Sequence, residues 1–439
     1  MTQTHTDDGI SLLQAVTIEV GLIVGGALFS LTGIAVGITG PGVVVAFVLA
    51  FAIAILGLVP TAMLGAAFPT TGGNYRYPAA LVSRPLAFLS AWGLGISMLT
   101  GGLPLYALTA GQYVNTLVSI SPLVIGFAIL TLFFLVNLIG LEPAATVQVV
   151  LFVGLIAALG TFITFGAQTV TTTNLTPVFP NGALGVVTAA GVLYFVCLGA
   201  NFVVDIGSDI RDATVTIPRS FAISVPLVLL VYVSIGLVAV GSVGSEMMAN
   251  ATLAVPAELF LPRTFQTLFV VGGALFAIAT SVNAVYIITP KYLEALADDS
   301  LIPQTIAEKN ERFDTHHWAL AIVYVLSVAA LVSPLPLSEL GSLLGFGGAF
   351  LIIPVMLAAL VAVRTRPAVV DSSIPLSTRT IAGMAALAVP FNLLLLVLLA
   401  SQSPQVFAVW CGCLAVGGGY YLVWTRTTDR TTTTPTLDP

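Results

Sequence analysis

Charged residues are scarce in this chain of 439 residues: only 7% are Asp, Glu, Lys or Arg, whereas 58% are hydrophobic. Soluble globular proteins carry about 25% charged residues. So few charges cannot cover a water-exposed surface, and the mean hydropathy of +1.07 points the same way. A soluble globular protein is therefore excluded, and we expect the lipid bilayer, rather than any nucleic acid, as the surroundings of this chain.

Cysteine and histidine are almost absent. Cys197, Cys411 and Cys413 lie inside apolar stretches and lack the spacing of a disulfide framework or a zinc site. The three histidines all lie in polar segments, at His5, His316 and His317. Because no nucleophile, metal cluster or pair of acids gathers at one depth, as a hydrolase or transferase site requires, the sequence predicts neither an enzyme nor a resident cofactor.

Long apolar runs, in contrast, recur along the whole chain. A helix needs about 20 apolar residues to cross the hydrocarbon of a bilayer, and runs of that length are separated only by short polar segments. The sequence therefore predicts an all-α polytopic membrane protein with twelve transmembrane helices, near residues 13–37, 42–67, 86–113, 122–141, 144–166, 184–206, 220–243, 265–290, 317–333, 339–363, 381–401 and 405–425.

The basic residues predict the orientation of these spans. The acidic amino terminus lacks the basic region of a secretory signal, so we interpret the first run as a retained span. With a cytoplasmic amino terminus, every one of the 13 Lys and Arg residues except Arg263 falls on the cytoplasmic side, as the positive-inside rule requires. We therefore expect a multi-pass protein of the plasma membrane with cytoplasmic N and C termini. Residues 1–12 form the cytoplasmic amino-terminal segment, and residues 426–439 form a disordered cytoplasmic tail.

Two of the predicted spans are interrupted. The first contains Gly21, Gly25, Gly26 and Gly33 inside an apolar run, and each glycine weakens a helix by about 1 kcal/mol relative to alanine. A break near residues 24–27 would expose backbone N–H groups and carbonyls at mid-membrane, where they can bind a carboxylate and a cation. The alternative is that these glycines only allow another helix to pack closely.

A second interruption favours the break. The sixth span, five spans after the first, reads YFVCLGANFVVDIGSDI and contains Gly199 and Asn201 within its apolar run. Irregularities at corresponding positions of two halves are typical of transporters built from inverted repeats.

Several segments resemble the amino acid, polyamine and organocation transporter superfamily. The most specific is FPTTGGNYRYPAALVSRPLAFLSAW (68–92), which is similar to the family's loop between helices two and three. The segment 281–313 resembles the end of helix eight and its following loop, although Leu296, Asp298 and Ser300 depart from the family pattern. After helix six, Asp209 stands where the family usually has glutamate, and Ile217-Pro218 is retained. The Gly-Ser-Gly-Ile-Phe of helix one reads GGALF (25–29) here, so the usual hydroxyl is missing at Gly26.

The resemblance covers residues 12–365 and implies a five-plus-five inverted repeat with discontinuous helices 1 and 6. The first repeat would be residues 13–166 and the second 184–363. Two further C-terminal helices, 381–425, lie outside the repeats.

The resemblance also implies a substrate site at the two breaks. Backbone N–H groups there would hold a carboxylate, with Val24, Gly25, Gly26 and Ala27 as the binding residues. Carbonyls of the sixth span would accept hydrogen bonds from an ammonium, with Phe195, Val196, Cys197, Leu198 and Gly199 as the binding residues and Phe195 as a gating aromatic. Residues 92–97 and Asn283 would form the pocket wall. Since these segments contain no acid or base, we expect a neutral and apolar amino acid as the substrate.

A coupling ion is also implied. Proton-linked relatives carry a lysine in helix five, where this chain has Leu155. Sodium-coupled proteins of the same fold use oxygens with the spacing of Gly21, Val24, Ala277, Thr280 and Ser281, a set suited to a small hard cation such as Na⁺. The alternative is that the two hydroxyls only bond to their own helix.

Glu19 and Asp205 are two acids within membrane depth, where ionisable residues are usually functional. Both point toward the cytoplasm, so each could lie in a wet vestibule. Either they take part in coupling or gating, or they are simply solvated or paired acids.

Three other functions remain open from the sequence: a proton-coupled or exchange transporter of another solute such as an amine or nucleobase, a channel, and a non-transporting sensor of substrate. Discontinuous helices with cytoplasmic gate loops favour alternating access over an open pore. The sequence does not identify an oligomeric state.

Overall fold

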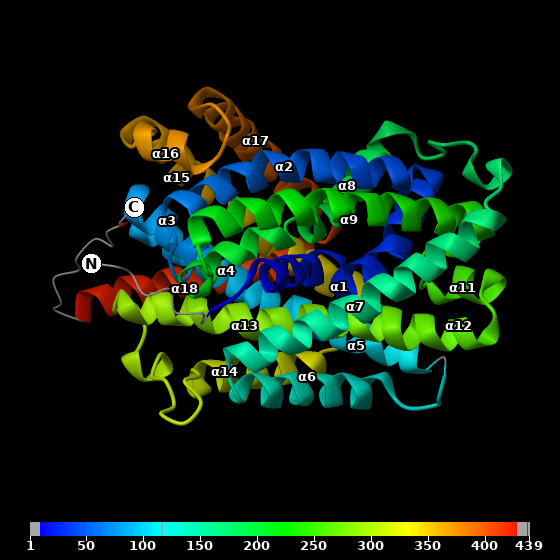
Figure 1. Cartoon of the computed structure of the whole chain (residues 1–439), viewed down its shortest axis with the longest axis horizontal. Helices are drawn as coiled ribbons and strands as arrows, with labels where there is room; N and C mark the ends of the chain where they lie inside the picture. Colours follow the sequence, from blue (N-terminus) through cyan, green and yellow to red (C-terminus); the bar gives the residue numbers. More distant parts are fainter. Residues whose placement is uncertain (1–8, 116, 428–436, 438–439) are drawn as a thin grey trace.

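A computed structural model describes residues 9–115, 117–427 and 437 of the chain. These residues are overwhelmingly helical, and the β-structure among them consists of two isolated bridges, Ile10 with Ile210 and Thr71 with Ile206. Figure 1 shows the long helices side by side along the long axis of the molecule. The prediction of an all-helical chain is confirmed.

The elements of the first half follow one another with short connections. The π-helical segment η2 (Met98–Gly102) joins α4 and α5 into one span. The helices are α1 (Leu12–Thr39), α2 (Val43–Ala67), α3 (Gly73–Leu81), α4 (Arg84–Ser97), α5 (Leu103–Asn115), α6 (Pro122–Leu138) and α7 (Leu141–Gly166).

The second half contains a further π-helical segment, η7 (Phe269–Leu275), which joins α12 to α13, and a 3₁₀ segment, η5 (Gly199–Asp205), which follows α8. Its helices are α8 (Gly182–Cys197), α9 (Ala213–Val243), α10 (Ser245–Met248), α11 (Ala254–Phe260), α12 (Arg263–Leu268), α13 (Phe276–Asp298), α14 (His317–Leu331) and α15 (Leu337–Thr365). The chain continues through α16 (Pro367–Ser373), α17 (Thr378–Gln402) and α18 (Pro404–Thr427). Most of the predicted amino-terminal segment and of the predicted tail lies outside the described residues.

Local sequence signals explain where several helices begin. Ser11 caps α1 and forms a capping box with Gln14, whose side chain accepts a hydrogen bond from the Ser11 N–H at 2.8 Å. Proline stands in the first turn of α4 and α6, where its missing N–H costs nothing. Before α3, Gly72 has φ +65°, and a Cβ there would lie 2.6 Å from the Ala295 Cβ. Only glycine therefore fits this turn.

Nine helices in the described part of the chain are long and apolar enough to cross a membrane, and three shorter apolar helices accompany them. The shorter ones are Leu12–Gly26, Pro122–Leu138 and His317–Leu331. Each of the twelve predicted ranges overlaps one of these helices or a part of it. The chain is therefore a polytopic membrane protein.

Helix α1 lies inside the bundle, in contact with α8, α9 and α13 (Figure 1). The outer helices instead expose large apolar side chains, such as Leu132 on α6, Val150 on α7, Val397 on α17 and Val416 on α18. Exposed apolar side chains on successive outer helices form the surface that faces lipid. The broken helix is thus held in the protein interior, where freed backbone groups are tolerated.

Candidate substrate and cation site

Helix α1 is broken at Gly25. This residue has φ −21° and ψ −146°, far from helical values, while the segments on both sides are helical. A Cβ at Gly25 would lie 1.6 Å from the Ser281 Oγ of α13. The break therefore lets α1 and α13 approach to a distance that no residue but glycine allows.

The sixth span is broken beside it. Helix α8 ends at Cys197, and the chain continues after Leu198 as the 3₁₀ segment η5. A Cβ at Gly199 would lie 2.6 Å from the backbone N of Ile23. The structure thus brings the two interruptions into direct contact.

The residues around the two breaks are buried. Val24, Gly25 and Gly26 from α1 and Val196, Cys197, Leu198 and Gly199 from the sixth span are all inaccessible to solvent. Ala27 and Phe195 belong to their helices, but their side chains lie outside the described part of the structure. The gating role expected for Phe195 therefore stays a prediction.

Two tyrosines that the sequence did not single out lie against the break. A Cβ at Gly26 would meet the Tyr106 ring of α5 at 2.6 Å. Tyr232 on α9 donates a hydrogen bond to the Ile23 carbonyl and packs on Phe47, with 5.0 Å between ring centroids. Aromatic rings thus cover the polar backbone of the break on two sides.

Four of the five oxygens expected around a cation come together. Ser281 Oγ donates to the Gly21 carbonyl at 2.9 Å, and Thr280 Oγ1 lies 3.3 Å from the same carbonyl and 2.6 Å from the Ala277 carbonyl. Ser281 Oγ also accepts a hydrogen bond from the Gly26 N–H at 3.1 Å. Val24, the fifth residue, is fully buried on the same half of α1. Both hydroxyls therefore bond across to α1, and among the described residues only that of Thr280 also bonds to its own helix.

Asn283 belongs to a chain of amides. Its Nδ2 donates to Gln148 Oε1 at 3.0 Å and to the Ala144 carbonyl at 2.9 Å, while its Oδ1 accepts from Asn137 at 2.9 Å. Gln148 in turn lies 3.3 Å from the Thr17 carbonyl and 3.2 Å from the Thr280 carbonyl. The side chain expected in the pocket wall is thus fully engaged in tying α6, α7 and α13 to α1.

Glu19 is completely buried. Its carboxyl group contacts Ser220 Oγ at 2.6 Å and also Ser224 Oγ, both on α9. The wet vestibule expected around this acid is not present in this conformation. Glu19 is paired with hydroxyls rather than with a cation.

Asp205 is also completely buried, at the end of η5. It accepts hydrogen bonds from the backbone N–H and the side-chain amide of Asn74, both at 2.8 Å. Asn201 adds a bond to Asn74 Oδ1 at 2.9 Å. The acid therefore fastens the sixth span to the first turn of α3, where a helix N-terminus favours negative charge.

Ion pairs join α3 and the sixth span to α13 at one end of the bundle, the end predicted to face the cytoplasm. Arg76 lies 2.6 Å from Asp298, and Lys291 lies 3.0 Å from Asp209. Tyr75 donates to Asp299 at 2.5 Å, and burial, followed by the charge of Asp299, holds the pKa of Tyr75 well above its ordinary value. The phenol therefore stays protonated and keeps this contact at physiological pH.

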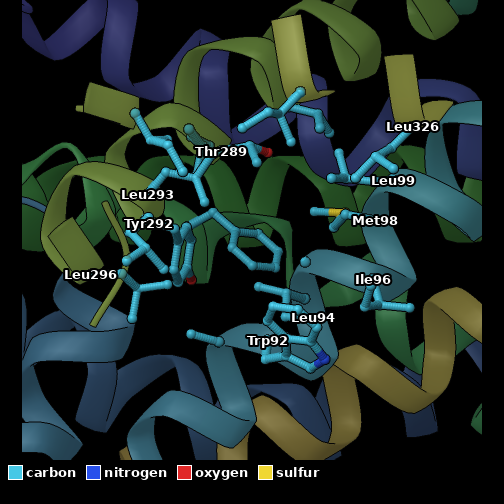
Figure 2. Close-up of a pocket in the computed structure, with 18 of the residues that line it drawn as sticks. Trp92, Leu94, Ile96, Met98, Leu99, Thr289, Tyr292, Leu293, Leu296 and Leu326 are labelled. Atoms are coloured by element: carbon cyan, nitrogen blue, oxygen red, sulfur yellow. The ribbon is translucent and has the colours of Figure 1, made fainter. Parts of the chain in front are cut away.

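A cavity of about 320 Å³ lies one helical turn from the two breaks, with Leu22 and Phe202 at its inner end. Figure 2 shows it between the side chains of α4, such as Trp92 and Leu94, and those of α13, such as Thr289 and Tyr292. Of the pocket wall predicted over residues 92–97, Trp92, Leu94, Gly95 and Ile96 line this cavity. The Ser97 side chain instead meets Gly347 of α15.

Among the described residues no cluster of His, Cys, Asp and Glu has the form of a transition-metal site. The buried charged side chains are Glu19, Asp205 and Lys291. The arrangement at the breaks therefore offers backbone dipoles and hydroxyls, which suit a zwitterion and a hard cation better than covalent chemistry.

Comparison with known proteins gives one consistent result. A family model described as amino acid permease matches residues 10–417. The branched-chain amino acid permease BcaP of Bacillus subtilis is 24% identical over 435 residues, which covers 93% of this chain and 90% of that protein. A methylthioribose transporter of the same organism is 24% identical and covers 80% of both chains. An uncharacterised transporter of Mycobacterium tuberculosis is 25% identical over 74% of this chain and 73% of its own length.

Proposed function

The chain belongs to the amino acid permease family, and from this premise we propose that it carries a neutral, apolar amino acid across the plasma membrane by alternating access. As a member of this family it is a transporter of amino acids or similar solutes, not an enzyme. The observation that carries the proposal is the contact between the two broken spans, at Gly25 and at Gly199, in the buried centre of the bundle.

The proposed architecture has twelve spans, with residues 13–166 and 184–363 as inverted repeats and both termini in the cytoplasm. The two breaks, five spans apart, support it. So do the two π-helical segments, which lie in the third and eighth spans and contain the paired glycines Gly101-Gly102 and Gly272-Gly273. π-Helical segments are rare and frequently mark functional sites, so their recurrence five spans apart favours a repeat.

The substrate carboxylate is proposed to bind the N–H groups at the α1 break, and the substrate ammonium to bind the carbonyls at the end of α8. Helix dipoles favour both contacts, since the second half of α1 begins and α8 ends at this point. No Asp, Glu, Lys or Arg side chain occurs among residues 20–29 or 192–204. A substrate with a charged side chain would therefore find no partner there. The named substrate of BcaP, branched-chain amino acids, fits this class.

Sodium is the proposed coupling ion. The support is the convergence of the Gly21 and Ala277 carbonyls with the Thr280 and Ser281 hydroxyls, an all-oxygen set from α1 and α13. A bound cation would turn both hydroxyl hydrogens away and hold the first half of α1 against α13. In that role the ion fixes the arrangement in which the substrate site is formed.

A second candidate is proton coupling through Glu19, favoured by its burial on the same half of α1, two residues before Gly21, with only serine hydroxyls as partners. Asp205 is proposed as a gating residue, because it joins the sixth span, just after its break, to the first turn of α3.

Uptake of radiolabelled L-leucine into proteoliposomes tests the proposal. We expect accumulation with an inward sodium gradient and none without one. Full uptake in choline with only a proton gradient would remove sodium coupling and leave the transporter assignment intact. Methylthioribose in place of leucine tests the other solute class named among the relatives. Ligand binding without counterflow would instead identify a sensor.

A further inference from the structure

The cavity between α4, α13 and α14 is distinct from the two helix breaks. Its cytoplasmic end is closed by the segment after α13, through Ile302, Pro303 and Ile306. Its inner end reaches Leu22, three residues before the α1 break. The substrate site itself is made of backbone groups at Gly25 and Gly199, and neither glycine lines the cavity.

The lining of the cavity is hydrocarbon almost throughout. Two of the four polar side chains in its lining bond to neighbouring carbonyls: Trp92 Nε1 donates to the Cys413 carbonyl at 2.9 Å, and Tyr420 Oη donates to the Leu301 carbonyl at 3.0 Å. Thr289 and Tyr292 contribute the two other hydroxyls (Figure 2). A buried water needs two to four polar partners, and apolar cavities of about 150 Å³ stay dry and bind apolar ligands. A cavity of about 320 Å³ with this lining therefore selects a hydrocarbon over water.

The outer end of the cavity lies on the lipid-facing side of the bundle. Leu326 of α14 lines the cavity and is 39% exposed. The same helix exposes Trp318 and Val325, at 63% and 60%, so its outer face lies in lipid. On the opposite wall, Gly95 and Ile96 of α4 are half-buried, and a Cβ at Gly95 would meet nothing within 4 Å. A hydrocarbon chain in the bilayer thus has an open route between α4 and α14.

We propose that this cavity binds an acyl chain of a membrane lipid, which enters from the bilayer between α4 and α14 and ends against Leu22 and Phe202. The bound chain fills the space beside the first half of α1, in contact with Leu22. This site does not depend on which solute or ion is transported.

Quenching of Trp92 fluorescence tests the proposal. The variant Trp318→Phe, Trp410→Phe, Trp424→Phe leaves Trp92 as the single tryptophan in the cavity wall. It is reconstituted in bilayers of phosphatidylcholine with dibrominated acyl chains, whose bromines quench tryptophan on contact. We expect strong quenching of Trp92. In the same background, Gly95→Leu fills the cavity and should lose most of that quenching.

Matched control variants show whether a loss of Trp92 quenching comes from a filled cavity or from misfolding. Gly383→Leu on α17 also places its side chain where a Cβ meets nothing within 4 Å, and it should leave the quenching unchanged. Leu99→Phe, which fills the cavity from η2, should reproduce the effect of Gly95→Leu, and thermal unfolding verifies that each variant is folded. Undiminished quenching in both folded filling variants would overturn the proposal. Loss of quenching on addition of saturating leucine would also overturn it, because the occupant would then be the solute.

Discussion

At the scale of single residues, glycine at position 25 is the strictest requirement of the site. The Cβ that alanine adds would overlap Ser281 Oγ and lie 3.0 Å from the Ala277 carbonyl. We expect Gly25→Ala to abolish leucine binding while the protein remains folded, because a Cβ 1.6 Å from the Ser281 Oγ forces the Ser281 side chain or α1 itself out of place. Binding is measured by thermal shift with leucine.

A paired substitution tests whether overlap with the Ser281 side chain causes this loss of binding. Ser281→Gly removes the overlapping side chain, so Gly25→Ala with Ser281→Gly should bind leucine better than Gly25→Ala alone. Ser281→Gly alone is the reference, because it also removes an oxygen of the proposed cation site. If Ser281→Gly alone binds leucine and the pair does not, the site requires the backbone conformation at Gly25 rather than its contact with α13.

Ser281 also tests the cation site. Ser281→Ala keeps the volume of the side chain nearly unchanged but removes one of the converging oxygens. We expect the sodium concentration for half-maximal uptake to rise by about tenfold, as for the loss of one contact worth about 1.4 kcal/mol. Ser342→Ala, which changes a half-buried serine on α15 whose hydroxyl contacts Ser338 and Ser403 instead, is the control. An unchanged sodium dependence would contradict the site.

Glu19 is buried beside two serine hydroxyls and no cation, surroundings that favour a neutral acid. Ser220 Oγ has one hydrogen but two neighbours that accept, Glu19 at 2.6 Å and the Ile217 carbonyl at 2.8 Å. If the Ser220 hydroxyl donates to the Ile217 carbonyl, the contact between Ser220 and Glu19 needs a hydrogen from Glu19. Glu19 is then a neutral acid, which its burial without a cation also favours. Glu19→Gln imitates this neutral form. It should bind leucine as the wild type does, but its uptake should no longer vary with pH. A pH profile identical to that of the wild type would exclude Glu19 from proton transfer.

At the scale of elements, Asp205 links η5 to α3, two segments that are far apart in the sequence. Asp205→Ala leaves two buried donors of Asn74 without partners, and each such group costs about 1–3 kcal/mol. We expect a clear fall in the temperature of thermal unfolding in detergent. Asp314→Ala removes an ion pair with Lys309 in which the Asp314 side chain is 82% exposed. This substitution should change the unfolding temperature little. Equal effects of the two substitutions would contradict the structural role of Asp205.

The elements themselves could be predicted from the sequence because their signals are local. Apolar run length places the helices, and glycine pairs place the break at Gly25. The contacts of those elements could not be predicted in the same way. Nothing in the sequence pairs Glu19 with serines about 200 residues later, and spacing alone could not show that Asn283 faces Gln148 and Asn137. Such partners depend on how distant helices pack.

At the scale of the whole molecule, the protein is a helical bundle with polar groups at its centre and at the end that carries Arg76 and Lys291. The centre holds the two breaks and the hydroxyls of α13, while the ion pairs of Arg76 and Lys291 lie at that end. The apolar outer helices provide the lipid-facing surface. This distribution suits a transporter that exposes one central site to each side in turn.

The central claim is that the break in α1 holds the carboxylate of an amino acid. The most direct measurement compares the binding of L-leucine with that of leucinamide and isopentylamine to the purified protein by isothermal titration calorimetry in sodium buffer. Leucine should bind, while leucinamide, which lacks the negative charge, and isopentylamine, which lacks the carboxyl group, should not. Binding of either amine as tightly as leucine would contradict the carboxylate site at Gly25 and Gly26.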